Sequence, residues 1–228
     1  MSHLPEGLFW LALTLVLYVA SRRLHGRFPH TLLSPIIAVP AVLITILLLA
    51  RVPYAAYNAQ SHWLSAMLGP ATVAFAVPIH QYRQVIRRHC FPLIAGVIVG
   101  MTVSVVSTVW FSRLFGLPEM LERSLSVRSI STPFAIAAAP QVGGQAELAA
   151  IFVVITGLAG MVLGEWLLSW LPVRTSLARG ALFGAGAHAV GTATAHRRDV
   201  EEGVISSLTM IIAGILMVLL APWLAAWV

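Results

Sequence analysis

Two kinds of residue in this sequence are candidates for ligand contact: a histidine among small residues, and prolines that interrupt apolar stretches. His188 is the only ionisable side chain between Arg179 and His196. If this segment lies in a membrane, we expect His188 to face a cavity or a protein partner, because an ionisable group facing lipid is unfavourable. It could hydrogen-bond an anion or take up a coupled proton near neutral pH. The alternative is a structural histidine bonded to a neighbouring carbonyl group.

Prolines flank two short apolar stretches of similar sequence. Pro70 and Pro78 flank the first stretch, and Pro133 and Pro140 flank the second. Proline removes a backbone donor and clashes with the preceding turn of a helix, so each stretch is predicted to be a broken helix. Broken helices at membrane depth can present backbone groups to a substrate, as they do in many transporters. A kinked helix with a purely packing role is the alternative.

The second of these stretches predicts a helix that begins near Thr132 and Pro133. Proline is tolerated in the first turn of a helix, and Ser131 or Thr132 could cap it. The free N–H groups and the positive dipole end of such a helix would suit a carboxylate. The residues that follow the helix offer amide donors and flexible backbone: Gln141, Gly143, Gly144 and Gln145.

No arrangement of residues indicates an enzyme active site or a metal site. The sequence lacks the His-Glu-x-x-His, Gly-x-Ser-x-Gly and P-loop patterns. Cys90 is the only cysteine, which excludes an intrachain disulfide and a cysteine-based metal cage. We therefore expect a protein that is not an enzyme, with no catalytic residue, no metal and no cofactor.

Acidic residues are few, and one lies within an apolar run. Glu165 is followed by Trp166 and Trp170, which favours an interfacial residue in an aromatic belt. A buried partner for an arginine is the alternative. The remaining acidic residues after residue 140 are expected to be solvated in loops: Glu147, Asp199, Glu201 and Glu202.

The composition predicts an all-α polytopic membrane protein. Hydrophobic residues make up 59% of the 228 residues and charged residues 10%, and the mean hydropathy is +0.89. A soluble domain has roughly 25% charged residues. Uncharged runs at residues 91–111 and 204–228 can each cross a hydrocarbon core of about 30 Å. The net charge of +6 comes from arginines at the ends of such runs, so lipid headgroups rather than nucleic acid are the expected partners.

These arginines also predict the topology, because cytoplasmic loops are enriched in basic residues. Arg22, Arg83 and Arg197 are expected on the cytoplasmic side and Tyr57 outside. Spans are expected at residues 8–20, 32–50, 64–81, 91–111, 148–171 and 204–228, with an external loop at 51–63 and an external amphipathic segment at 113–128. Two weaker segments, residues 129–146 and 180–195, could cross or re-enter the membrane, and charge asymmetry favours re-entry. The total is about six to eight membrane segments.

The two halves of the chain resemble each other, which indicates a possible inverted repeat. Gly69-Pro-Ala-Thr-Val-Ala-Phe-Ala-Val-Pro78 resembles Thr132-Pro-Phe-Ala-Ile-Ala-Ala-Ala-Pro140. Gly96-Val-Ile-Val-Gly100 resembles Gly160-Met-Val-Leu-Gly164 in the same order. In the re-entrant topology the spans after these motifs run in opposite directions, as in many transporters. Chance recurrence of Ala, Gly and Pro is the alternative.

Five short motifs in order make the sequence similar to the LrgB/CidB family, which includes YohK-like bacterial proteins. They are Gly69-Pro-Ala-Thr-Val-Ala-Phe-Ala-Val-Pro78, Arg128-Ser-Ile-Ser-Thr-Pro133, Gln141-Val-Gly-Gly144, His188-Ala-Val-Gly-Thr-Ala193 and Glu202-Gly-Val-Ile-Ser-Ser-Leu208. The similarity extends from Leu8 to Leu224 and includes the LrgB-like part of the plastidic glycolate/glycerate transporter. It implies one LrgB-like transmembrane domain over residues 1–228, multi-pass in the bacterial inner (cytoplasmic) membrane.

The resemblance implies a transporter of small monocarboxylates such as glycolate, glycerate, pyruvate or lactate. The alternative is a holin- or antiholin-like regulator of murein hydrolase export and autolysis, and a third reading is a scaffold subunit without flux. Besides the carboxylate and the bilayer, the expected partners are a small LrgA/CidA-like membrane protein and further copies of this chain.

The expected substrate-binding residues combine the broken-helix argument with these motifs. They are Pro70, Thr72, Thr132, Pro133, Gln141, Gly143, Gly144, His188, Gly191, Thr192 and Ser206. Many relatives have an acidic residue where Ala137 stands, and asparagine where Ala213 precedes Gly214. Both departures remove a polar group near the expected site, so the substrate of a relative does not transfer directly to this chain.

Overall fold

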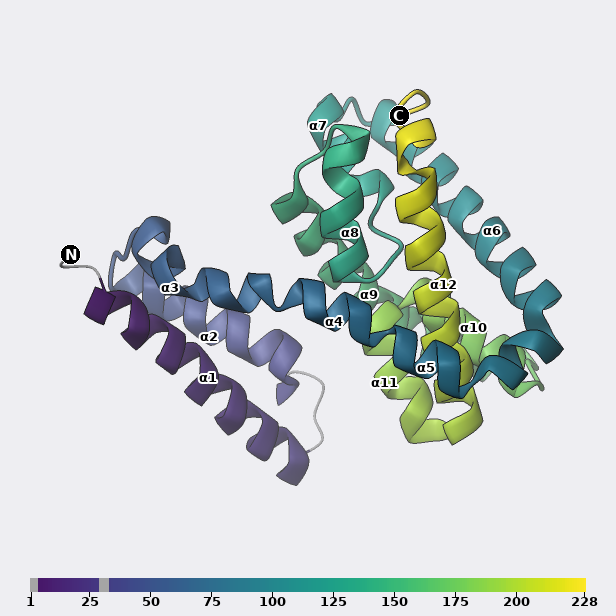
Figure 1. The fold of residues 1–228 in the computed structure, drawn as a ribbon, viewed down its shortest axis with the longest axis horizontal. Helices are drawn as coiled ribbons and strands as arrows, with labels where there is room; N and C mark the ends of the chain where they lie inside the picture. Colours follow the sequence, from purple (N-terminus) through teal and green to yellow (C-terminus); the bar gives the residue numbers. More distant parts are fainter. Residues whose placement is uncertain (1–3, 29–32) are drawn as a thin grey trace. The chain divides into compact units, whose positions relative to one another are not determined.

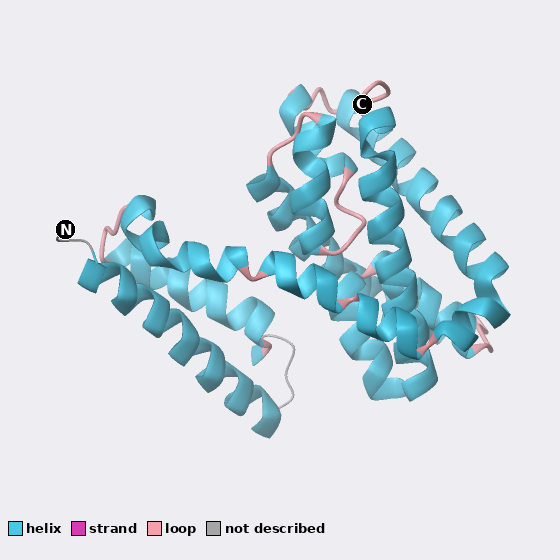
Figure 2. Cartoon of the chain, viewed as in Figure 1, coloured by secondary structure: helices cyan, strands magenta, loops and turns pink. Residues whose placement is uncertain are grey.

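The computed structural model describes residues 4–28 and 33–228, and it divides into two compact units, Met1–Pro70 and Ala71–Val228. The described residues form helices joined by turns and short loops (Figure 2). Four helical segments are long and apolar enough to cross a membrane: Leu8–Arg27, Arg83–Leu114, Ala146–Trp170 and Val200–Leu224. The predicted class, an all-α polytopic membrane protein, is confirmed. The single domain over residues 1–228 stays a prediction.

The first unit contains α1 (Leu4–Arg27), α2 (Pro35–Leu49) and α3 (Tyr54–Ala66), and α1 packs against both other helices. The Ser21 hydroxyl donates to the Leu33 carbonyl at 3.1 Å and links α1 to the start of α2. The prediction of a loop at residues 51–63 is wrong, because most of this segment forms α3. The run after Pro53 contains no glycine or proline to interrupt a helix.

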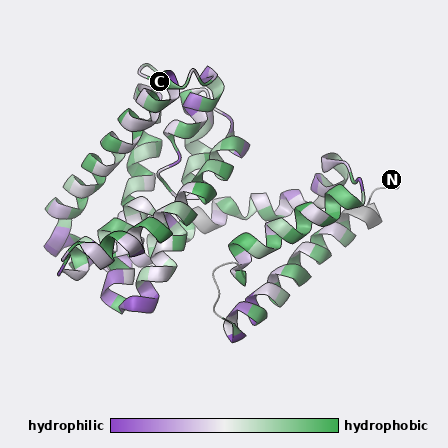
Figure 3. Cartoon of the chain, turned by 180° about the vertical axis from the view of Figure 1, so that it is seen from behind, coloured by the Kyte–Doolittle hydropathy of each residue, from purple (hydrophilic) through white to green (hydrophobic). Residues whose placement is uncertain are grey.

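The second unit is built around α12 (Figure 1), whose N-terminal half is almost entirely buried. The elements before it are α5 (Ala76–Gln81), α6 (Arg83–Leu114), α7 (Glu119–Ser126), α8 (Thr132–Ala138), the short 3-10 helix η2 (Ala139–Val142), α9 (Ala146–Trp170), α10 (Ser176–Gly186) and α11 (His188–Arg198), and α12 itself is Val200–Leu224. Both α6 and α9 leave apolar residues such as Val103 and Ile155 exposed. Hydrophobic residues line the long helices while hydrophilic ones gather near helix ends (Figure 3), as a lipid environment requires.

Both proline-flanked stretches are broken, as predicted. The first forms α4 (Leu68–Ala74) and α5, which are separated at Phe75, and the second forms α8 and η2. α4 crosses the boundary between the two units. Phe75 and Phe134, one from each stretch, stack with ring centroids 5.6 Å apart. The two similar sequences therefore meet in the second unit.

Residues 127–145, here called the first hairpin, leave α7 and return to it. A short turn joins α7 to the start of α8 over residues 127–131, and α8 with η2 leads back. The hairpin closes where the Gln145 backbone N–H donates to the Ser124 hydroxyl of α7 at 2.9 Å. The segment thus begins and ends at the same helix, and its re-entry into a membrane stays a prediction.

Residues 176–198, here called the second hairpin, consist of α10 and α11, and both pack along α12. Near the open end of the hairpin, Arg179 of α10 and Arg198 of α11 both pair with Glu202 in the first turn of α12. One turn further along α12, the Thr192 and Ser206 hydroxyls are 2.8 Å apart. Both arms thus start from the same end of α12, and re-entry of this hairpin into a membrane likewise stays a prediction.

The two hairpins approach each other from opposite ends of the second unit. In Figure 1, α7 and α8 lie beside the C-terminal half of α12, and α10 and α11 beside its N-terminal half. Their turns meet near the middle of α9: Arg128 donates to Thr156 at 3.3 Å, and a Cβ at Gly160 would clash with the Gly186 carbonyl. We call residues 128–131 and 185–188 the tips of the first and second hairpins.

The structure shows where three acidic residues lie. Glu202 differs from the sequence expectation, and Glu165 decides between the two alternatives given for it. Glu202, expected in a solvated loop, is 2% exposed in α12, because two arginines provide the charge partners that a buried carboxylate needs. Asp199 caps α12 by accepting from the Glu201 and Glu202 backbone N–H groups. Glu165 is exposed on α9, which rules out the alternative of a buried ion pair.

The segment expected to be an external amphipathic surface helix is also more buried than expected. It contains α7, in which Glu122, Ser124 and Ser126 are buried. Glu122 accepts from the Nε of Arg113, at the end of α6, at 3.1 Å. α7 therefore packs against the helices of the second unit and forms the base from which the first hairpin leaves.

Candidate functional site

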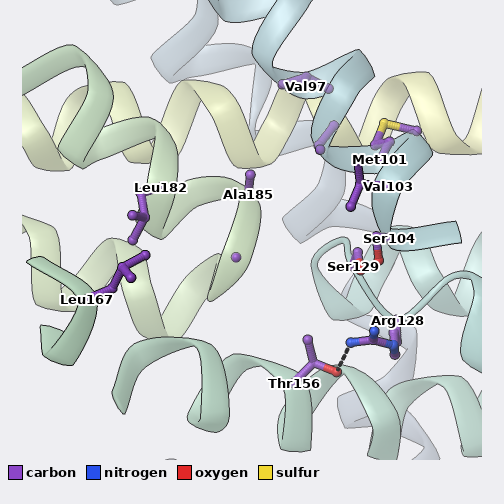
Figure 4. A pocket seen from close by; sticks show the side chains of 13 residues that line it. Val97, Met101, Val103, Ser104, Arg128, Ser129, Thr156, Leu167, Leu182 and Ala185 are labelled. Atoms are coloured by element: carbon purple, nitrogen blue, oxygen red, sulfur yellow. Dashed lines mark hydrogen bonds between the residues drawn. The ribbon is translucent and has the colours of Figure 1, made fainter. Parts of the chain in front are cut away.

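A cavity of about 670 Å³ lies where the hairpin tips meet. Its lining comes from α6, α9, α10, α12 and the first hairpin: Val97, Gly100, Met101, Val103, Ser104, Arg128, Ser129, Thr156, Leu167, Leu182, Ala185, Gly186 and Ala213. Most of these residues are apolar or small, while Arg128, Ser129 and Thr156 cluster on one side (Figure 4). A largely apolar cavity with a few converging polar groups is the usual form of a small-molecule site.

Arg128 is the charged residue of this cavity, and two hydroxyl groups orient it. Its Nε donates to Thr108 Oγ1 at 3.2 Å, and its Nη1 donates to Thr156 Oγ1 at 3.3 Å. Threonine hydroxyls position the guanidinium group but leave its charge unneutralised.

Among the residues whose side chains the structure describes, no carboxylate pairs with Arg128. Glu119, Glu122 and Glu202 pair with other arginines, and Asp199 caps a helix. The remaining described acidic side chains are exposed: Glu147, Glu165 and Glu201. A partly buried guanidinium without a counter-ion is costly, so the cavity presents a place for an anion.

The tip of the first hairpin supplies further polar atoms. The Ser129 hydroxyl forms a hydrogen bond with the Ser104 hydroxyl of α6. Ser131 occupies the N-cap position of α8, as predicted, but its side chain makes no capping bond. Its buried hydroxyl has no hydrogen-bond partner in the described structure. Buried polar atoms are normally bonded, so an unpartnered hydroxyl at the tip needs an explanation.

The tip of the second hairpin places His188 next to the first. His188 is 2% exposed, and neither ring nitrogen forms a well-aligned hydrogen bond in the described structure, although the Ser129 backbone lies close to the ring. It does not line the cavity itself; its ring lies against Gly157 of α9 and beside Arg128 and the Ser129 backbone. Its φ of 49° lies in the left-handed region, where a histidine is strained by about 1–3 kcal/mol. Strain and unpaired nitrogens together indicate a role beyond packing.

Some of the predicted site residues lie near this cavity. Thr132 and Pro133 begin α8 directly after the first tip, and His188 follows the lining residue Gly186. The structure thus brings together one predicted group from each half of the chain.

Other predicted residues lie elsewhere in the second unit. Gln141, Gly143 and Gly144 are at the base of the first hairpin, where a Cβ on either glycine would clash with α7. Gly143 has a φ of 78° and ends η2. Gln141 is exposed, and its amide donates to the Ala137 carbonyl at 3.1 Å. These three residues shape the return of the hairpin and lie away from its tip.

The predicted residues of the second hairpin and of the first proline stretch also lie apart from the tips. Thr192 and Ser206 bond each other between α11 and α12, and Gly191 packs against Phe183. Pro70 is exposed in the first unit, and the Thr72 side chain lies outside the described residues.

The main residue that sequence reasoning missed is Arg128. As the last charge of a polar segment it was assigned to an external surface, and only the return of the chain through the first hairpin places it inside. The available signal was its position directly before Ser-Ile-Ser-Thr-Pro, where a single arginine enters an otherwise uncharged, proline-containing stretch. Ser104 and Thr156 gave a weaker signal, as hydroxyls within apolar helices.

Comparison with known proteins places this arrangement in a family. The sequence model of the LrgB-like family matches residues 14–227. Uncharacterized protein YwbG of Bacillus subtilis (strain 168) is 37% identical over 97% of this chain and 98% of its own length. Holin-like protein CidB of Staphylococcus epidermidis and CidB of Staphylococcus aureus are each 29% identical over 97% of both chains. No solved structure matches. With nearly its whole length matched, this multi-pass membrane protein belongs to the LrgB-like family.

Proposed function

We propose that this LrgB-like protein binds a small monocarboxylate beside Arg128 and carries it across the membrane. The observation that supports this best is the unneutralised guanidinium group at the cavity, which two threonine hydroxyls orient. A carboxylate would accept charge-assisted hydrogen bonds from the guanidinium N–H groups not used by the threonines. One cation in the cavity favours a ligand with one negative charge.

The surroundings of Arg128 support a small ligand. The cavity volume of about 670 Å³ is ample for a two- or three-carbon acid such as glycolate, glycerate, pyruvate or lactate. The Ser129 hydroxyl lines the same cavity, and hydroxyls suit the oxygen atoms of such acids. The bacterial inner membrane is the proposed location.

The arrangement of the hairpins supports movement of the ligand across the membrane. Two re-entrant segments that approach from opposite sides and meet at a polar site are typical of carriers, in which one side opens at a time. A pore would instead need a continuous polar path along whole helices. The described long helices carry apolar exposed faces such as Val99 and Val103.

A second candidate is a holin-like regulator of murein hydrolase export and autolysis. The observation that favours it is the name of the staphylococcal relatives, holin-like protein CidB. These names favour the regulator over the carrier, because no name among the relatives given above refers to transport. Either function is compatible with a small LrgA/CidA-like partner and with homo-oligomers, which we also propose.

Uptake by the purified protein in liposomes distinguishes the two candidates. We expect saturable uptake of at least one acid from a panel of radiolabelled glycolate, glycerate, pyruvate and lactate. Arg128→Gln should abolish it, whereas Arg174→Gln, at an exposed arginine, should not. Absence of saturable uptake by the wild type, with altered autolysis in cells, would favour the regulator and contradict the carrier.

A further inference from the structure

His188 is a buried ionisable group that binding at Arg128 alone leaves unexplained. We propose that it takes up one proton when an anion binds beside Arg128, so that the carrier moves a monocarboxylate together with a proton. This inference rests on the proposed carrier function and specifies its coupling ion. It adds an ionisable site in the tip of the second hairpin to the anion site in the tip of the first.

The geometry of His188 supports proton uptake. The residue is 2% exposed, and the Ser129 backbone lies beside its ring without forming a well-aligned hydrogen bond, so a ring nitrogen remains available for a proton. A structural histidine would be expected to bond a neighbouring carbonyl firmly. The left-handed backbone, with a φ of 49°, holds the ring at the tip against Gly157 rather than along the arm of the hairpin.

Arg128 is the charged group that faces His188 among the described residues. The charged groups on the packed helices lie elsewhere. Glu147 and Glu165 are exposed near the two ends of α9. In α12, Glu201 is exposed, and Glu202 pairs with Arg179 of α10 and Arg198 of α11.

The charges of Arg128 and His188 couple binding of the anion to binding of the proton. In an empty site burial of the ring is the main factor that opposes an imidazolium, and repulsion by the neighbouring Arg128 guanidinium adds to it. A bound carboxylate neutralises the guanidinium and so removes the repulsion that opposes an imidazolium. The proton comes from water on the side where the anion enters, is held by a ring nitrogen, and leaves with the anion. The moving charges of anion and proton cancel.

Two further properties follow from this coupling. Because the effect of one ligand on another is reciprocal, protons must tighten anion binding as much as the anion tightens proton binding. The affinity for the anion should therefore rise by up to about tenfold per unit fall in pH, the slope for one linked proton. Since anion and proton move together, net uptake should not respond to membrane potential.

Calorimetry on the full-length purified protein tests the proposal. Glycolate, pyruvate, lactate and acetate are titrated at pH 7 in two buffers with different heats of protonation. The difference in binding heat gives the number of protons taken up with each anion. We expect about one proton per bound anion in the wild type and in His62→Gln, whose histidine is exposed.

Two variants test whether the proton binds at His188 and the anion at Arg128. Asparagine is among the side chains that tolerate a left-handed backbone best, so His188→Asn should fold. It should bind the anion with no linked proton and with an affinity independent of pH. Arg128→Gln should lose anion binding, with affinity reduced at least tenfold. Circular dichroism and gel filtration establish that each variant is folded.

The outcomes separate this inference from the proposed function. Wild-type binding without linked protons, or linked protons that persist in His188→Asn, would overturn the coupling and leave the carrier standing. If His188→Asn does not fold, the wild-type proton count and pH dependence still decide. No binding of any acid in the panel to the wild type would contradict the proposed function itself.

Discussion

The two hairpins end at the same cavity but are fixed to the protein in different ways. The first is held by apolar side chains: Val127, Ile130, Ala135, Ala138, Ala139 and Val142 are all completely buried in one hydrophobic cluster. The second is held by close backbone approach and by charge. Gly180 and Gly184 lie directly against the Glu202 and Ser206 carbonyls, and the Glu202 carboxylate pairs with both arms.

This difference assigns different roles to the arginines. In the second hairpin, Arg179 and Arg198 are neutralised by Glu202 and fasten the arms to α12. In the first hairpin apolar packing supplies the attachment, and no carboxylate among the described side chains pairs with Arg128. The proposed ligand-binding arginine thus differs from the two structural arginines in having no carboxylate partner among the described side chains.

Substitution of Arg128 should have the largest effect, and it should lower the affinity for a carboxylate without lowering the stability of the fold. Charge-assisted hydrogen bonds contribute roughly 1.5–3 kcal/mol, so Arg128→Gln should weaken carboxylate binding by about 10- to 150-fold. Arg128→Lys retains the charge and should recover part of the loss. Equilibrium binding of a labelled acid gives the affinity. The matched variant Arg179→Gln should lower thermal stability and leave affinity within about twofold; the reverse pattern would invalidate the comparison.

A smaller effect is expected where the two halves of the repeat differ. Gly96 and Gly160 occupy matching positions in the two similar motifs, but only Gly160 lies against a hairpin tip. Gly160→Ala should destabilise the protein by about 1–3 kcal/mol, because its Cβ would clash with the Gly186 carbonyl. Gly96→Ala has open space and should stabilise its helix by roughly 0.5–1 kcal/mol. Thermal unfolding in detergent checks this, and equal effects at both positions would contradict the tip contact.

The Glu202 carboxylate should be nearly as important for stability. Removing one member of a buried ion pair can cost about 3–5 kcal/mol. Arg179 and Arg198 have side chains 31% and 37% exposed and can regain water, so Glu202→Ala should cost roughly 1–3 kcal/mol. The exposed neighbour provides the control, since Glu201→Ala should be within about 0.5 kcal/mol of the wild type. Indistinguishable unfolding temperatures for the two variants would show that Glu202 does not fasten the hairpin.

The smallest predicted effect concerns a single hydroxyl pair. Thr192 and Ser206 bond each other at 2.8 Å between α11 and α12. Thr192→Val should cost about 0.5–1.5 kcal/mol, the usual contribution of one hydrogen bond. A double-mutant cycle with Ser206→Ala isolates the bond from other losses. If the losses in the free energy of unfolding were additive in the double variant, the hydroxyls would not interact in the folded protein.

Sequence patterns predicted those parts of the fold that depend on local chemistry. Apolar runs located the long helices α6, α9 and α12, and Pro133 marked the start of α8. The positive-inside asymmetry favoured re-entry of both weak segments, and that topology stays a prediction. Each of these signals requires only the nearby chain and the bilayer.

The site was less predictable because it depends on contacts between distant segments. Arg128 lies at the end of a polar stretch, and only the return of the first hairpin beside Ser104 and Thr156 places it in a cavity. Glu202 has the sequence surroundings of a solvated loop, and its burial depends on Arg179 from another helix. His188 was recognisable because an ionisable residue among small ones stands out locally.

The central claim is that the first hairpin folds back and brings its tip against Ser104 of α6. Ser104 and Ser129 are in side-chain contact, so Ser104→Cys combined with Ser129→Cys places two sulfur atoms within disulfide distance. We would introduce both in a Cys90→Ala background, oxidise the protein in membranes, and detect the intrachain disulfide by mass spectrometry. Ser104→Cys with Ser169→Cys, at the far end of α9, is the control. Rapid cross-linking of the first pair alone is the predicted result. Failure to cross-link in folded protein, with position 129 labelled from the external solution, would contradict the claim.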